Sequence, residues 1–259
     1  MKNGGSAAAG RLPILWRAAG LDNGPRPGLE MSLGAGIIRA DTRDMDTATP
    51  LSRPRWRGRL HQVAFFVSVP AGLWLVAAGS TLAARVSTAI YAVTLSAMYG
   101  ASAALHRIYW GPRALGFMRR LDHSMIFVLI AGTYTPFALL ALRPPWSTVV
   151  LAVVWGGAAL GVAVRLLSER FDVLRGTLYI VLGWVGVLVL PAVIGELGGV
   201  GLGLMLAGGL CYTVGAVLFW LRKPALRPEV FGYHELWHVL VVCGSLCHYG
   251  LILLLVLGA

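Results

Sequence analysis

The sequence is poor in charged residues and in cysteine. Charged residues make up 13% of the 259 residues, and apolar residues make up 57%. A soluble domain carries about 25% charged residues, so this composition excludes an ordinary soluble enzyme and a disordered chain. The three cysteines, Cys211, Cys243 and Cys247, all lie in apolar runs. This placement argues against the disulfide framework of a small secreted protein.

The distribution of apolar residues divides the chain into two parts. Residues 1–50 mix glycine, alanine, arginine, proline and aspartate without a sustained period, which predicts a disordered cytoplasmic tail. Residues 51–259 are predicted to form a membrane domain. Its apolar runs cover about 61–80, 86–106, 121–142, 146–165, 176–195, 199–221 and 235–258. Because a helix needs about 20 apolar residues to cross the hydrocarbon core, we expect an all-α, polytopic bundle of seven transmembrane helices.

Acidic residues are scarce beside basic ones, and the excess of basic residues predicts the topology. The chain has 22 Lys and Arg against 11 Asp and Glu, a net charge of +11. In a soluble protein this excess would favour nucleic-acid binding. Here all basic residues except Arg85 and Arg143 fall on one side of the seven spans. The positive-inside rule therefore predicts a multi-pass plasma-membrane protein with a cytoplasmic N-terminus, an external C-terminus and no nucleic-acid partner.

A few polar residues interrupt the spans, and they fall at the same depth. Ser102 and His106 are one turn apart near the cytoplasmic end of the second span, and Asp122 opens the third. His234 and His238 lie one turn apart at the start of the last span, so both can face one ion. Three imidazoles suit a zinc ion with an open fourth position. Asp122 is then placed to act as a general base.

Each of these residues also has a structural interpretation. Asp122 can cap the third helix, Ser102 can allow close helix packing, and the pair His234 and His238 can serve as hydrogen-bonded packing residues. His123 is expected to point away from Asp122, and His61 is expected to be an interface residue at the membrane boundary. His248 lies ten residues beyond His238, deep in the membrane.

The segment from His234 to His238 also matches a protease motif. His234, Glu235 and His238 form HExxH, in which the glutamate is the general base of zinc proteases. An intramembrane metalloprotease is therefore an alternative prediction. The polar partners in the second and third spans favour a different arrangement.

The same motifs give the chain a family resemblance. Three motifs follow one another in spans two, three and seven: Ser102–His106 as SxxxH, Asp122 in DHSMIFVLIAGTYTPF, and His234–His238 as HxxxH. This combination resembles the hemolysin III branch of the progestin and adiponectin Q receptor (PAQR) family, within a superfamily that includes alkaline ceramidases. The resemblance covers about residues 55–259.

The resemblance implies a seven-helix domain with zinc held by three histidines. His106, His234 and His238 would be the ligands, Asp122 would contact a water on the ion, and Ser102 would lie beside the site. Related branches hydrolyse lipid amides, so a zinc-dependent hydrolase of lipid amide or acyl bonds is the leading expectation, with membrane lipids as partners. The alternatives are a lipid sensor or receptor with structural zinc, and a cytolysin.

Overall fold

The membrane domain is built from helices. The computed structural model describes residues 54–167, 172–224, 226–227 and 229–258, so the predicted tail of residues 1–50 lies outside the described part of the chain. The helices are α1 (Arg59–Ala78), α2 (Leu82–Arg107), α3 (Pro112–Ala141), α4 (Trp146–Leu167), α5 (Asp172–Gly183), α6 (Val185–Leu188), α7 (Leu190–Leu221) and α8 (Tyr233–Gly258). Six of them, all but α5 and α6, are long and apolar enough to cross a membrane. The predicted all-α membrane fold is confirmed.

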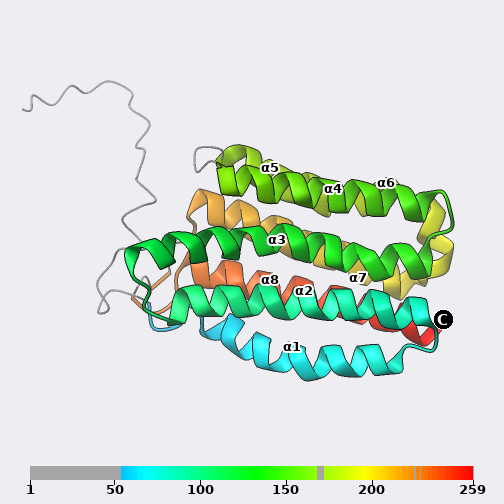
Figure 1. Ribbon diagram of the computed structural model, residues 1–259, viewed down its shortest axis with the longest axis horizontal. Coiled ribbons are helices and arrows are strands. Elements are labelled where there is room, and N and C mark those ends of the chain that lie inside the picture. The colour runs from blue at the N-terminus through cyan, green and yellow to red at the C-terminus, as the bar shows by residue number, and fades with distance from the viewer. Residues whose placement is uncertain (1–53, 168–171, 225, 228, 259) are drawn as a thin grey trace, which may run out of the picture. The chain divides into compact units, whose positions relative to one another are not determined.

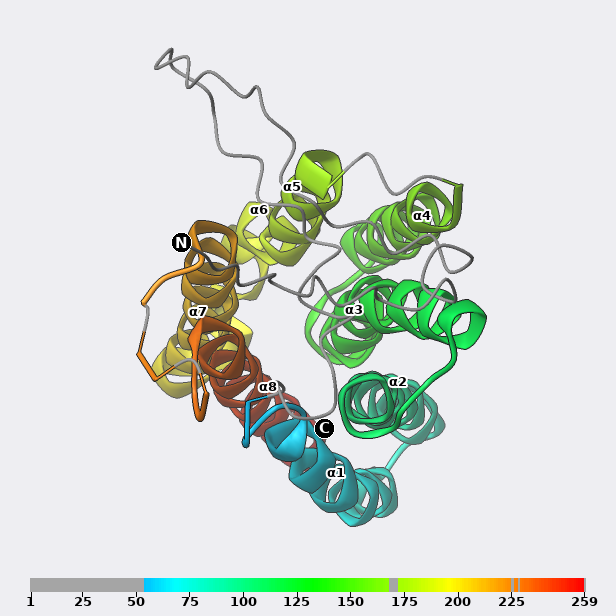
Figure 2. The same ribbon diagram turned by 90° about the vertical axis from the view of Figure 1, so that its left-hand side faces the viewer.

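The helices follow one another around the bundle. Each long helix runs roughly antiparallel to its neighbour along the chain, from α1 to α4 and again from α7 to α8 (Figure 1). Seen end-on, α5 and α6 lie between α4 and α7, and α8 returns to pack against α1 (Figure 2). The N-terminal ends of α1, α3 and α8 and the C-terminal end of α2 therefore meet at one end of the bundle, which we call the histidine end.

Basic residues gather at the histidine end. Among the described residues, every Lys and Arg except Arg85 and Arg143 lies in a loop or within the terminal two to three turns of a helix at that end. Arg85 and Arg143 stand at the opposite end, beside the α1–α2 and α3–α4 connections. The charge asymmetry read from the sequence is thus an asymmetry between the two ends of the bundle.

The interior contains two apolar clusters, and the outer surface is apolar as well. One cluster packs α3 and α4 against α5, α6 and α7, and includes Phe127, Val154 and Val193. The other packs α1, α2 and α8 together, and includes Tyr91 and Ile252. Many large apolar side chains face outward on the membrane-length helices. Such a surface is expected where the surroundings are lipid rather than water.

The fifth predicted span is not one straight helix. Residues 176–195 are divided among α5, α6 and the first turns of α7, with interruptions at Trp184 and Val189. Pro191 lies in the first turn of α7. Because proline has no backbone N–H, it cannot donate a hydrogen bond to a carbonyl of the preceding turn. Gly198, at φ 60°, separates this segment from the sixth predicted span of residues 199–221. The count of seven spans stays a prediction, because six helices reach membrane length in the described part of the chain.

A side chain of α3 forms hydrogen bonds with the backbone at the break between α5 and α6. The Tyr134 hydroxyl donates to the Gly183 carbonyl at 2.7 Å and accepts from the Gly186 N–H at 2.7 Å. Within a bilayer, backbone groups freed by a helix break need such partners because water is absent. Tyr134 therefore stabilises the interruption between α5 and α6.

Candidate metal centre

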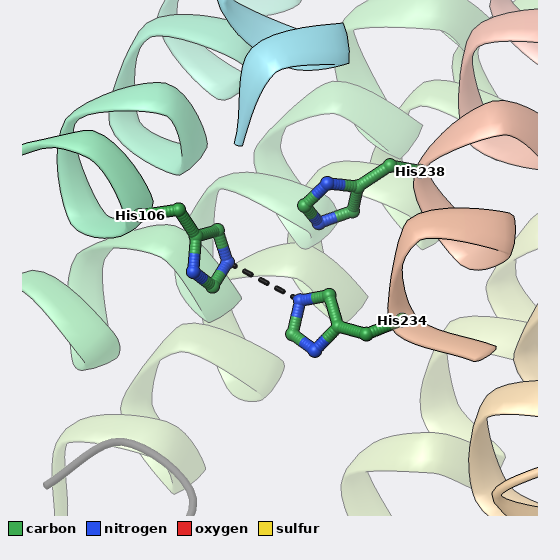
Figure 3. Close-up of side chains that lie close together, drawn as sticks. All are labelled: His106, His234 and His238. Carbon is green, nitrogen blue, oxygen red and sulfur yellow. Dashed lines mark hydrogen bonds between the residues drawn. The ribbon is translucent and has the colours of Figure 1, made fainter. Parts of the chain in front are cut away.

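Three histidines meet at the histidine end of the bundle. His106 comes from the last turn of α2, whereas His234 and His238 come from the first two turns of α8. One ring nitrogen from each lies within 4.8 Å of the others, and the Nε2 atoms of His106 and His234 are 3.3 Å apart. Figure 3 shows the three rings directed toward one another. The predicted convergence of these histidines is present in the structure.

Local helix geometry and burial hold the three rings in place. His234 and His238 are separated by four residues, so they project from the same side of α8. His106 and His238 are buried, and His234 is half-buried. Since imidazole rings in such surroundings have few water molecules to bind, they need hydrogen-bond partners or a metal ion.

The donor set suits a divalent metal ion. Two nitrogens bound to one tetrahedral zinc ion at about 2.0–2.1 Å lie about 3.3–3.4 Å apart. The Nε2 atoms of His106 and His234 already have this separation. Three imidazoles fit zinc and also other transition metals that accept nitrogen ligands. The three histidines are therefore close enough to bind a metal ion, whose identity is not fixed by the geometry.

Ser102 and Asp122 have different relations to the cluster. Ser102 is buried one turn before His106 on α2. Asp122 is half-buried in α3, and its carboxylate is not among the described ligand atoms that lie within 4.8 Å of one another. Because α3 begins at Pro112, Asp122 is not in the first turn, and the capping interpretation is wrong. Its predicted role through a water molecule stays a prediction.

Glu235 of the HExxH string is held by a buried ion pair. Its Oε1 accepts a hydrogen bond from Arg57 Nε at 2.6 Å, and its Oε2 accepts one from the Gly232 N–H at 2.7 Å. The glutamate side chain is almost fully buried. Both carboxylate oxygens thus have structural partners at the start of α8, which favours a positioning role over that of a protease base.

The segment before α1 crosses the histidine end. Residues 54–58, the juxtamembrane strap, are tied to the α7–α8 loop by hydrogen bonds from the Arg55 and Trp56 N–H groups to the Glu229 and Val230 carbonyls. Gly58 has φ 75°, and a Cβ atom there would lie 2.6 Å from that of His106. Only glycine permits this conformation and this close approach. The strap therefore covers His106.

The strap also reaches His234. Arg57 Nη1 lies 3.3 Å from His234 Nδ1, on the side of the ring opposite the atom that faces His106. Sequence reasoning counted Arg57 only as a basic residue before the first span. Its partners on α8 follow it by more than 170 residues, so no local pattern could have identified them.

His61 was also misjudged from the sequence. His61 lies in the first turn of α1, but its interpretation as only an interface residue is wrong, because it is 2% exposed and stacks on His238 with ring centroids 4.0 Å apart. The signal available was its position at the same end as the other histidines. His123 and His248 lie outside the three-histidine cluster. The His123 carbonyl accepts from the Tyr179 hydroxyl, and His248 lines a separate cavity.

These observations define a class of protein: a polytopic helical membrane protein with a buried three-histidine cluster at one end. Residues 50–249 match the family model described as haemolysin-III related, and the chain belongs to that family. The resemblance to hemolysin III seen in the sequence is confirmed.

Several curated relatives are similar over most of their length. Hemolysin-3 of Bacillus cereus is 35% identical over 189 residues, which cover 71% of this chain and 83% of the relative. The Hemolysin-3 homolog of Bacillus subtilis (strain 168) is 31% identical over 190 residues, covering 71% and 85%. The heptahelical transmembrane protein ADIPOR2 of Oryza sativa subsp. japonica is 33% identical over 150 residues, covering 50% and 64%. The match to ADIPOR2 agrees with the wider PAQR relationship.

Proposed function

We propose that the protein is a zinc-dependent hydrolase of lipid amide or acyl bonds in the plasma membrane. The observation that carries this proposal is that His106, His234 and His238 lie close together, with His106 and His238 buried and His234 half-buried. Three neutral nitrogen ligands leave a fourth position open on a tetrahedral ion, as in catalytic zinc sites. A purely structural zinc site more often has four protein ligands.

The residues of the centre divide the chemistry among them. His106, His234 and His238 would hold the ion, which when bound polarises a carbonyl and lowers the pKa of a water to about 7. Asp122 would accept the proton of the attacking water and pass it to the departing nitrogen or oxygen. Ser102 would orient the reacting carbonyl by a hydrogen bond. Water adds across the bond, giving a carboxylic acid and an amine or alcohol.

The described part of the bundle also contains a small cavity of about 50 Å³. It lies between α3, α5–α6, α7 and α8, and its lining includes Phe137, Trp184, Leu206 and His248. His248 follows His238 by ten residues, which corresponds to about 15 Å along α8, half of the hydrocarbon core. The cavity is therefore separate from the cluster, and at this size it is too small to hold an acyl chain.

Lipid hydrolysis by the purified protein tests this proposal. We expect the metal-loaded full chain in detergent to release fatty acid from one member of a panel of ceramides and phospholipids, detected by mass spectrometry. Asp122→Asn should lower the rate by about 10²–10⁴-fold, the usual loss when a general base is removed, while metal content stays near one ion per chain. Release that is unchanged in Asp122→Asn would contradict the assignment of the base.

Three other outcomes would support the alternatives. The relatives' name, Hemolysin-3, makes membrane lysis the second candidate. Dye release from liposomes that persists after chelation of the metal would favour a cytolysin. Metal binding without any lipid product would favour a sensor or receptor with structural zinc. Loss of activity in Glu235→Gln, together with a tolerated Asp122→Asn, would favour the metalloprotease.

A further inference from the structure

A fourth histidine lies against the three-histidine cluster. His61, in the first turn of α1, stacks on His238 with ring planes inclined by 17°. Tyr99 of α2 meets the His61 ring edge-on, with centroids 5.1 Å apart. His61 is therefore enclosed between a proposed metal ligand and an aromatic side chain, and it is 2% exposed.

The His61 ring makes aromatic contacts, but its two nitrogens lack hydrogen bonds with full geometry among the described residues. Both nitrogens are buried, and the backbone of His238 lies close to the ring. An unsatisfied buried polar group costs about 1–3 kcal/mol. A phenylalanine would keep the stacking contact without that cost. The choice of an imidazole at this position is thus not explained by packing.

We propose that His61 is a positioning residue of the metal centre, where one of its ring nitrogens hydrogen-bonds an oxygen atom held beside His238. The oxygen comes from a water molecule or from the polar group of a lipid. The proposal rests on the proposed metal centre and extends it to a residue that does not belong to the ligand set. Groups that hydrogen-bond around a metal site orient its contents and tune the metal.

The variant His61→Phe separates this role from a structural one. It keeps an aromatic ring against His238 and removes both nitrogens. With cobalt(II) as the probe metal in the full chain, we expect one ion per chain, a changed visible absorption spectrum, and metal affinity weaker by about 10–100-fold. If His61 only fills space, His61→Phe will leave the spectrum and the affinity unchanged, which would overturn the proposal.

A second variant provides the rescue. His61→Gln restores hydrogen-bonding groups without the ring, so we expect its affinity and spectrum to lie between those of the wild type and His61→Phe. If His61→Phe fails to fold, the comparison of His61→Gln with His61→Leu carries the test: equal spectra for these two and the wild type would overturn the proposal.

Two further measurements identify the oxygen and separate this proposal from the previous one. A spectral difference between wild type and His61→Phe in lipid-free detergent indicates water, whereas a difference that needs added ceramide or phosphatidylcholine indicates a lipid oxygen. Failure of the wild type itself to bind cobalt(II) or zinc would refute the metal centre. A wild type that binds metal but hydrolyses no lipid would refute the hydrolase and leave the spectral test of His61 intact.

Discussion

The two halves of the bundle differ in what they bury. Helices α1, α2 and α8 bury polar side chains along their length: His61, Ser68, Ser87, Thr88, Thr94, Ser102, His106, Glu235, His238 and Ser245. The other half, α3 to α7, buries mostly apolar residues. Its buried polar side chains are Ser124, Thr135, Ser147, Arg165 and Arg175, and the buried residues of α7 are Val193, Leu197, Gly201, Gly208 and Gly215. The polar half depends on specific contacts between polar side chains, such as those of Arg57 with Glu235 and of His106 with His234, which fix the positions of these side chains. The apolar half depends more on apolar packing, and it contains the interrupted segment of α5, α6 and the start of α7.

Removing a metal ligand should have the largest effect on the polar half. Alanine at His106, His234 or His238 leaves two imidazoles, and we expect metal content to fall from about one ion per chain to a small fraction of that. The measurement is elemental analysis of the purified variants. The matched control, His248→Ala, removes a histidine of α8 that lies outside the three-histidine cluster and should retain its metal. Full metal content in all three ligand variants would show that the centre is elsewhere.

Breaking the Arg57–Glu235 pair should have the next largest effect. Arg57→Leu leaves the Glu235 carboxylate buried, with the Gly232 N–H as its remaining partner among the described residues, which we expect to cost about 3–5 kcal/mol. The measurement is thermal unfolding of the detergent-solubilised protein. The double variant Arg57→Leu, Glu235→Leu removes the unpaired charge and should recover most of the loss. Equal stability of the single and double variants would argue against a buried ion pair.

The smallest effect is expected from Tyr134→Phe in the apolar half. It removes the hydroxyl that bonds Gly183 and Gly186, a loss of about 1–3 kcal/mol. Hydrogen exchange should become faster in α5 and α6 while the first turns of α8 stay protected. Tyr249→Phe is the control, because its hydroxyl donates to the Ala71 carbonyl in the polar half. Faster exchange throughout the bundle in Tyr134→Phe would mean that the halves are not independent.

The apolar runs predicted most of the fold because lipid selects helices by length and hydropathy. They could not predict the division of residues 176–195, since the run stays apolar across the break near Pro191. Hydropathy also placed the start of the third span at 121, whereas α3 begins at Pro112. The intervening turns carry arginines and are helical without being apolar, which is why the capping interpretation of Asp122 was wrong.

The histidine cluster could be predicted because each member carries a local signal. The spacing of His234 and His238 sets a common helix face, and the order of the spans brings His106 to the same end. Arg57 and His61 carry no comparable signal. Their contacts with Glu235 and His238 depend on how α1 packs against α8, which is a property of the assembled bundle.

The separation of Arg57 from Glu235 along the chain has a consequence for biosynthesis. The two residues are 178 positions apart, and a polypeptide emerges from the ribosome N-terminus first. The strap and α2 therefore enter the membrane long before α8 has been translated. An ion cannot find its complete set of ligands until the last helix has been inserted. The three-histidine cluster is thus completed only at the last step of assembly, and a chain truncated before α8 has His106 without His234 and His238.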